Sequence, residues 1–317
     1  MTPGDLRVDG HVDLPYYLMN REVETRFQEV ETGPFTLEKA REAGVRLFVT
    51  ALYCEDPYNG DSAAGRLREV LDFALDRLEG ITMVQGLRDL ASLRDDTQAV
   101  GTLFLLENAD ALAGNPSGAE ALWHKGVRVI GLTHAGKNRL ADGNAVAFSE
   151  GLTREGEDVV RAALDCGMLL DAAHLHPGCF RELMRLVEAP VISSHTGVRE
   201  RCDIPRNLSL EQVAELLQRD GLVGITFNPE MITAGRPARI DDVFAHLDTV
   251  VQKFGPGGVA IGSDLCGFDR VAEGLEDVRG FSRLADVLLD HGYEKEAVAG
   301  ILGGNWLRIL ERLYAAS

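Results

Sequence analysis

The chain has 317 residues, 45% of them hydrophobic, and its 50 acidic against 32 basic side chains give a formal net charge of −18. This charge repels phosphate backbones and anionic lipid surfaces, so neither nucleic acid nor a membrane is an expected partner. The length suits one α/β barrel, which typically takes about 250 residues plus insertions. We therefore predict a single domain over residues 1–317.

The start of the chain, MTPGDLRVDG, has neither the basic nor the apolar region of a secretory signal. No apolar run approaches the roughly 20 residues that cross a bilayer. The cysteines are scattered, odd in number and without a Cys-x-x-Cys spacing: Cys54, Cys166, Cys179, Cys202 and Cys266. These features predict a cytoplasmic protein with reduced thiols, without disulfides or a structural zinc site.

Short apolar or β-branched runs alternate with amphipathic stretches of helical length. The main strands are predicted over residues 6–13, 45–53, 102–108, 127–134, 168–174, 190–195, 222–228 and 258–264, with an extra or edge strand over 81–85. Helices are predicted over 62–78, 153–167, 177–189 and 209–221, the last beginning with a Ser209–Gln212 capping box. Repeated strand-then-helix order implies parallel strands, and eight of them predict a closed (β/α)₈ TIM barrel rather than an open sheet.

Most of these strands end on or beside a residue that binds metals or transfers protons. These residues are His11, Asp13, Glu107, His134, His174, His195 and Asp264. The carboxyl ends of barrel strands meet at one face, where the active sites of this fold lie. We therefore expect the seven residues to form one site. For the His-x-Asp pair taken alone, the alternative is a satisfied polar pair near a strand end.

Five of these residues offer a set of nitrogen and oxygen ligands: His11, Asp13, Glu107, His174 and His195. Imidazole with carboxylate suits Zn²⁺ and its first-row neighbours better than Ca²⁺ or Mg²⁺. Five ligands exceed the three of an open catalytic zinc site, whereas two ions about 3.5–4 Å apart accommodate them. Glu107 is the expected bridge because a carboxylate has two oxygens. Its alternative is a solvent-facing acid at a helix start.

Other polar residues compete for places in this site. His176 lies two positions beyond His174, but it precedes Pro177, where a loop or helix begins, so His174 is the preferred ligand. Cys266 is expected to be a small packing thiol. Surface or packing positions in or beside helices are expected for the remaining histidines: His124, His246 and His291.

Six sequence blocks resemble, in the same order, those of the membrane dipeptidase (renal dipeptidase) family of zinc peptidases, peptidase family M19. The blocks are DGHVDLP, LTHAGKNRLADG, DAAHLHP, ISSHTGV, IPRNLS and GSDLCGFDRVAEGLEDV, and the resemblance continues to GGNWLRIL. It implies a metal-dependent hydrolase barrel of the amidohydrolase-like type. Members cleave dipeptides and often tolerate a D-residue at the C-terminal position, which makes a small dipeptide the implied substrate.

The resemblance also implies a role for each site residue. Two Zn²⁺ ions per chain would be held by His11, Asp13 and the bridging Glu107 on one side, and by Glu107, His174 and His195 on the other. His134 would contact the substrate and the developing oxyanion. Arg206 in IPRN would bind the terminal carboxylate of the substrate, and Asp264 would transfer the proton. Family members are often dimers, which leaves a homodimer open, and the membrane anchor of the animal members is not expected here.

Three departures from the family pattern concern the substrate. DLCG at residues 264–267 replaces the usual Asp-Phe-Asp-Gly, so Cys266 stands in place of the second acid. TGVRERCD at 196–203 is expected to place Arg199 and Arg201 near the mouth of the site, and TFNPEMI lacks a tyrosine often found near the substrate side chain. A zinc amidohydrolase for N-acyl amino acids, lactams or specialised peptide conjugates is therefore the alternative function. A non-catalytic metal-binding barrel is disfavoured, because such a protein has no need of a proton carrier.

Overall fold

The structure, a computed structural model, describes residues 6–316. The first five positions of the predicted signal-free start therefore lie outside the described residues. Residues 6–316 contain one sheet of nine parallel strands. They are β1 (Arg7–Val12), β2 (Val45–Tyr53), β3 (Thr82–Met83), β4 (Gly101–Glu107), β5 (Val127–Gly131), β6 (Leu169–Asp171), β7 (Val191–Thr196), β8 (Leu222–Ile225) and β9 (Val259–Ile261). Neighbouring strands pair in the order β1-β2-β4-β5-β6-β7-β8-β9. The short β3, which corresponds to the predicted extra strand, pairs only with β4.

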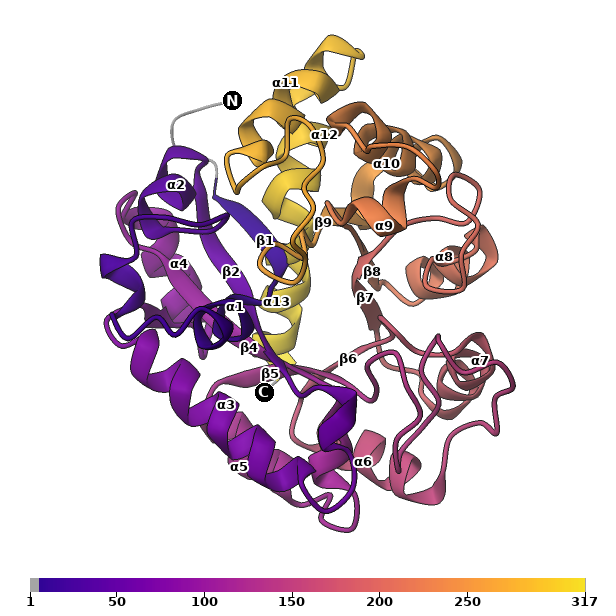
Figure 1. Cartoon of the computed structure of the whole chain (residues 1–317). Coiled ribbons are helices and arrows are strands. Elements are labelled where there is room, and N and C mark those ends of the chain that lie inside the picture. Colours follow the sequence, from indigo (N-terminus) through magenta and orange to yellow (C-terminus); the bar gives the residue numbers. More distant parts are fainter. Residues whose placement is uncertain (1–5, 317) are drawn as a thin grey trace.

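The sheet curls into a nearly closed barrel, in which β1 meets the chain that follows β9 (Figure 1). Val12 and Leu265 form a parallel bridge at this seam. The Asp13 amide donates to the Leu265 carbonyl at 3.0 Å, and the Asp264 amide donates to the His11 carbonyl at 3.0 Å. The predicted (β/α)₈ architecture is thereby confirmed, and the seam brings the first and last site-bearing segments into direct contact.

Helices surround the barrel (Figure 1). In chain order they are α1 (Leu14–Asn20), α2 (Leu37–Glu42), α3 (Ala63–Arg77), α4 (Leu87–Asp95), α5 (Gly118–His124), α6 (Arg154–Asp165), α7 (Pro177–Leu186), α8 (Leu210–Gln218), α9 (Pro229–Ile232), α10 (Ile240–Phe254), α11 (Gly280–Asp290), α12 (Lys295–Ala299) and α13 (Asn305–Ala316). The four predicted helices are present as α3, α6, α7 and α8. The Ser209 hydroxyl accepts from the Gln212 amide, and the Gln212 side chain accepts from the Ser209 amide, which confirms the capping box. Within residues 6–316, none of the helices has the length and apolar character needed to span a bilayer.

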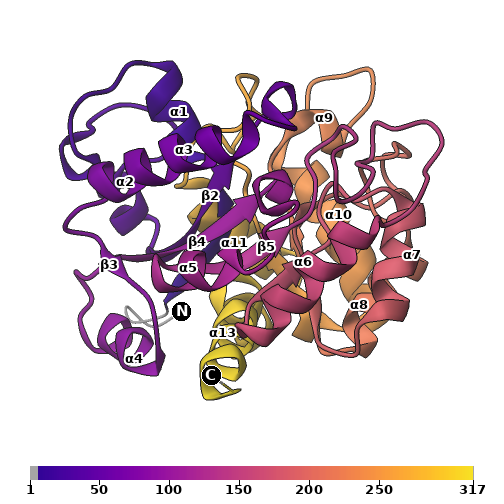
Figure 2. The same cartoon turned by 90° about the horizontal axis from the view of Figure 1, so that it is seen from below.

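One end of the barrel is filled by apolar side chains. Trp306 of α13 is fully buried and donates its indole N–H to the Ile261 carbonyl at 3.0 Å. A Cβ on Gly10 of β1 would lie 2.2 Å from the Trp306 ring, so glycine is needed where the ring packs against the strand. Figure 2 shows α4 and α13 at this end, and α1 and α9 at the opposite end. The polar site therefore has to lie at the end that carries α1 and α9.

Several strands end earlier than the sequence predicts. The predicted segments 168–174 and 258–264 end as strands at Asp171 and Ile261. Three residues beyond these ends, His174 and Asp264 have φ values of +65° and +63°, a left-handed conformation that is uncommon outside glycine. Both residues consequently project from loops that immediately follow β6 and β9.

Candidate active site

The structure places the seven predicted site residues at the carboxyl ends of the barrel strands. His11 and His195 lie within β1 and β7, and Glu107 is the last residue of β4. The loops that follow β1, β5, β6 and β9 carry the others: Asp13, His134, His174 and Asp264. Because parallel strands bring these ends to one face, residues separated by up to 250 positions become neighbours.

The carboxylate of Glu107 lies at the centre of this cluster. Its Oε2 lies 3.1 Å from Nε2 of His11, and its Oε1 lies 3.3 Å from Nε2 of His174. Asp13 Oδ2 lies 3.5 Å from the same His11 nitrogen, and the Nε2 atoms of His174 and His195 are 3.0 Å apart. The two oxygens of one carboxylate therefore face two different sets of imidazoles.

The cluster fits a cation. Three groups of potential ligand atoms lie within 4.8 Å of one another: His11 with Asp13 and Glu107, Glu107 with His134 and His174, and His11 with His195 and Asp264. The first group coincides with a triplet implied by the sequence resemblance, whereas the second contains His134 where the resemblance has His195. Nε2 of His11 and Oε2 of Glu107, 3.1 Å apart, are both buried and have no further hydrogen-bond partner among the described residues. A cation bound beside them would coordinate both atoms.

Two of the imidazoles are held neutral. Burial lowers the pKa of His174 and of His195 well below the usual histidine value, and the positive charge of Arg206 lowers both further. Neutral imidazole is the form that ligates a metal. Both side chains are therefore in the metal-binding protonation state at neutral pH.

The other side of the cluster holds a charge pair. Burial opposes ionisation of both Glu107 and His11, but their mutual contact lowers the pKa of Glu107, and the charges of Asp13 and Glu107 raise the pKa of His11 well above its usual value. In the metal-free protein, His11 accordingly keeps a proton between two carboxylates. A positive charge is thus stabilised at the position that a metal ion would take.

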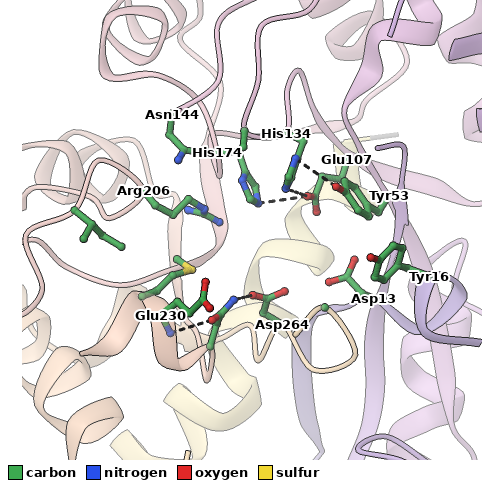
Figure 3. A pocket seen from close by; sticks show the side chains of 15 residues that line it. Asp13, Tyr16, Tyr53, Glu107, His134, Asn144, His174, Arg206, Glu230 and Asp264 are labelled. Carbon is green, nitrogen blue, oxygen red and sulfur yellow. Dashed lines mark hydrogen bonds and ion pairs between the residues drawn. The ribbon is translucent and has the colours of Figure 1, made fainter. Parts of the chain in front are cut away.

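Beside the cluster lies a cavity of about 440 Å³ (Figure 3). Its lining includes cluster residues and several side chains that the sequence analysis did not single out: Tyr16, Tyr53, Asn144, Asn228 and Glu230. Tyr53 is the last residue of β2, and the other four lie in segments that follow β1, β5 and β8. Only their spatial proximity marks them as lining residues. A cavity of this size suits a small substrate.

Arg206 projects into the cavity opposite Glu107 (Figure 3). One terminal nitrogen donates to the His195 carbonyl at 3.0 Å, whereas the buried Nε has no hydrogen-bond partner among the described residues. Burial lowers the pKa of this guanidinium, although Asp264 and Glu107 oppose the shift. Donors of this planar group remain free to bind a carboxylate in two places.

His134 is oriented by residues that follow β2. Its Nδ1 lies 3.0 Å from Oδ2 of Asp56 and 3.4 Å from the Tyr53 hydroxyl. The same Asp56 oxygen accepts from the Gly136 amide at 3.0 Å. Burial opposes protonation, but Asp56 and Glu107 together raise the pKa of His134. The contact with Asp56 therefore fixes the ring with Nδ1 turned toward Asp56.

Asp264 is held by Asn228, within the TFNPEMI segment. The Asn228 amide nitrogen donates to Oδ2 of Asp264 at 2.8 Å, and its oxygen accepts from the Glu230 amide at 3.1 Å, which fixes the orientation of the side chain. Burial and the nearby charge of Asp13 raise the pKa of Asp264 well above its usual value. A Cβ at Gly267 would lie 2.5 Å from the Asp264 carboxylate, so glycine is required there.

The arginines at 199 and 201 are not among the residues that line the cavity. Arg199 pairs with Asp203 at 3.2 Å, and Arg201 donates to the Thr249 hydroxyl of α10 at 2.6 Å. Arg206 alone of the arginines lines the cavity within the described residues. Cys266 is buried and has a φ of +76°, as expected for a packing residue in a tight turn.

The other histidines have structural positions. His176 precedes α7 and accepts a hydrogen bond from the Gly178 amide at 2.9 Å, which caps the helix. His246 is buried between the Val198 amide and the Ile232 carbonyl. His124 and His291 are exposed. The preference for His174 over His176 agrees with this geometry, because the His176 ring nitrogen is engaged in the cap.

Comparison with known proteins identifies the family. The model of the membrane dipeptidase family, peptidase family M19, matches residues 6–317. The chain belongs to this family. Dipeptidase 3 of Mus musculus is 28% identical over 96% of this chain and 64% of its own length, so the chain spans about two thirds of that relative. Dipeptidase verJ of Clonostachys rogersoniana is also 28% identical, over 98% of this chain and 84% of its own.

Two solved structures share the fold. A dipeptidase AC of this family has a TM-score of 0.88 at 23% identity, covering 98% of this chain and 99% of that one. A Rhodobacter sphaeroides metallo peptidase, solved with a phosphinate mimic of the dipeptide L-Ala-D-Ala, has a TM-score of 0.85 at 22% identity, covering 97% and 99%. At these identities the comparison establishes the fold of this M19 chain.

Paired histidine substitutions test the ligand assignment. His174→Ala removes an imidazole beside Glu107, and we expect the purified protein to lose at least one equivalent of bound zinc by elemental analysis. His176→Ala removes only a helix cap, so it should keep the wild-type metal content while its free energy of unfolding falls by about 1 kcal/mol. Equal metal content in the two variants would contradict the assignment of His174.

Proposed function

We propose that this M19 protein is a binuclear zinc dipeptidase that hydrolyses dipeptides with a free C-terminal carboxylate. The proposal rests mainly on one observation. A cluster that fits a cation and the guanidinium of Arg206, whose Nε has no hydrogen-bond partner among the described residues, lie around one small cavity. The names of the relatives, Dipeptidase 3 and Dipeptidase verJ, support the same activity.

The proposed zinc ligands divide around Glu107. His11 and Asp13 would complete one position, and His174 and His195 the other, with Glu107 shared between them. When bound, the two ions would polarise the scissile carbonyl and lower the pKa of a water nucleophile. The chain's own residues perform the remaining tasks of positioning the substrate and moving protons.

Arg206 binds the carboxylate of the substrate. One of its nitrogens is held by the His195 carbonyl, which fixes the guanidinium plane and leaves other donors facing the cavity. Two parallel hydrogen bonds to a carboxylate distinguish a free C-terminus from an amide or a further residue. The Rhodobacter relative bound to a mimic of L-Ala-D-Ala supports acceptance of a D-residue at this position.

Asp264 transfers the proton. It receives a proton from the attacking water and passes it to the leaving amine, while the Asn228 amide keeps its carboxylate in place. A raised pKa suits this task, because a group that titrates nearer neutral pH both accepts and releases a proton readily.

His134 stabilises the oxyanion. Since Asp56 accepts the Nδ1 proton, the imidazolium directs Nε2–H toward the cavity, where negative charge develops on the carbonyl oxygen. A positioned donor of this kind typically contributes about 10²–10³ in rate.

A zinc amidohydrolase for other carboxylate-bearing amides is the second candidate. It is favoured by the lining of the cavity, where Asn228 and Glu230 occupy the segment that lacks the expected tyrosine. Such substrates would use the same metal cluster, Arg206 and Asp264, and differ only in the group on the acyl side.

Substitution of Arg206 tests the substrate assignment. Arg206→Ala should lower kcat/KM for a dipeptide with a free C-terminus by about 10–100-fold, because a charge-assisted hydrogen bond contributes roughly 1.5–3 kcal/mol. The low wild-type rate on amidated dipeptides should not change. Arg199→Ala, which removes an arginine outside the cavity, is the matched control and should preserve the discrimination. If Arg206→Ala still distinguished free from amidated C-termini as the wild type does, the carboxylate assignment would be wrong.

Substitution of Asp264 tests the proton transfer. Asp264→Asn keeps the shape of the side chain but removes its basicity, so kcat should fall by about 10²–10⁴ with the zinc content unchanged. Asp269→Asn is the control, since Asp269 has an exposed side chain three residues beyond the turn. Near-normal turnover of Asp264→Asn would exclude Asp264 as the proton carrier.

A further inference from the structure

A single serine hydroxyl lies between the imidazoles of the two proposed metal positions. Ser194 is fully buried in β7, and its Oγ is 3.2 Å from Nδ1 of His11 and 2.9 Å from Nδ1 of His195. The two rings lie 3.8 Å apart between centroids. Both rings turn Nδ1 toward this hydroxyl and Nε2 toward the cluster around Glu107.

The backbone of Ser194 is anchored by a buried carboxylate at the end of β6. Asp171 Oδ1 accepts from the backbone amides of Ser194 at 2.9 Å and Ala173 at 3.0 Å. These bonds fix the strand segment from which the hydroxyl projects. A serine oxygen has two lone pairs, so Oγ of Ser194 can accept from both Nδ1 atoms at once.

The position of this oxygen suits two metal-binding rings. A neutral imidazole that ligates a metal through Nε2 carries its proton on Nδ1. Oγ of Ser194 is placed to accept both of these protons, so with metal bound each ring can present its Nε2 lone pair to the cluster. His174 has no such partner, because its buried Nδ1 lacks a hydrogen bond among the described residues.

We propose that Ser194, anchored by Asp171 through its backbone amide, is a positioning residue that holds the His11 and His195 imidazoles together in their metal-binding orientation, with Nε2 toward the cluster. This inference rests on the proposed two-metal centre. A metal-binding imidazole ordinarily has its own hydrogen-bond acceptor behind it. Here one oxygen serves two rings assigned to different ions, so the affinities of the two positions are linked through it.

The test compares alanine substitutions at adjacent serines. Ser193 is also fully buried in β7, and its hydroxyl has no hydrogen-bond partner among the described residues, so Ser193→Ala makes the same change of volume without touching either ring. Zinc affinity of the metal-free proteins is measured by competition with a chromophoric chelator. Ser194→Ala should weaken both binding steps by about 10–100-fold, whereas Ser193→Ala should match the wild type.

Two kinds of result in this zinc titration would contradict the account. Unchanged affinity in Ser194→Ala, or weakening of one step alone, would overturn the shared positioning while leaving the two-metal centre intact. Failure of the wild type to bind two zinc ions would overturn the metal centre itself.

A second measurement needs no variant. Nitrogen-15 NMR of the zinc-loaded wild type with labelled histidine reports which ring nitrogen carries the proton. We expect His11 and His195 both to carry it on Nδ1, facing Ser194, and a proton on Nε2 of either ring would overturn the inference even if Ser194→Ala did not fold.

Discussion

The burial of the Glu107 carboxylate is the constraint on which the site depends. A buried carboxylate must be compensated by positive charge or hydrogen bonds, and the groups that approach its two oxygens are the imidazoles of His11 and His174, at 3.1 and 3.3 Å. Because Glu107 ends the central strand β4, its place is fixed by backbone pairing on both sides. The remaining site residues lie around those two oxygens. A carboxylate shared by two cations needs other ligands near each of its oxygens, as found here.

The barrel makes this arrangement rigid. Apolar side chains and Trp306 fill one end, so the polar groups gather at the other. Left-handed backbone occurs at His174 and Asp264, in the loops that follow β6 and β9 and carry these side chains to the site. Each is an unfavourable conformation for a non-glycine residue, retained where the surrounding structure holds it. The guanidinium of Arg206 faces the cluster across the cavity. The proposal of a dipeptidase depends on having this guanidinium and the cluster in one cavity.

Sequence reasoning predicted what depends on local pattern. Strand periodicity located the barrel strands, and the metal-binding residue types at their ends could be recognised one strand at a time. What it missed depends on contacts between distant segments. Asp56 and Asn228 follow β2 and β8 and are marked only by their hydrogen bonds to His134 and Asp264. The contact of Arg201 with the Thr249 hydroxyl of α10, 48 positions away, was equally outside the reach of local pattern.

The most direct test of the central claim is the hydrolysis of a substrate panel by protein of known metal content. Metal-free and zinc-reconstituted protein would be assayed with L,L- and L,D-dipeptides beside N-acyl amino acids that carry the same C-terminal residue. We predict that the metal-free protein is inactive, and that activity on free dipeptides returns with two equivalents of zinc and exceeds that on the acyl amino acids. Dipeptide hydrolysis that is unaffected by zinc removal, or turnover of acyl amino acids without dipeptides, would contradict the proposed function.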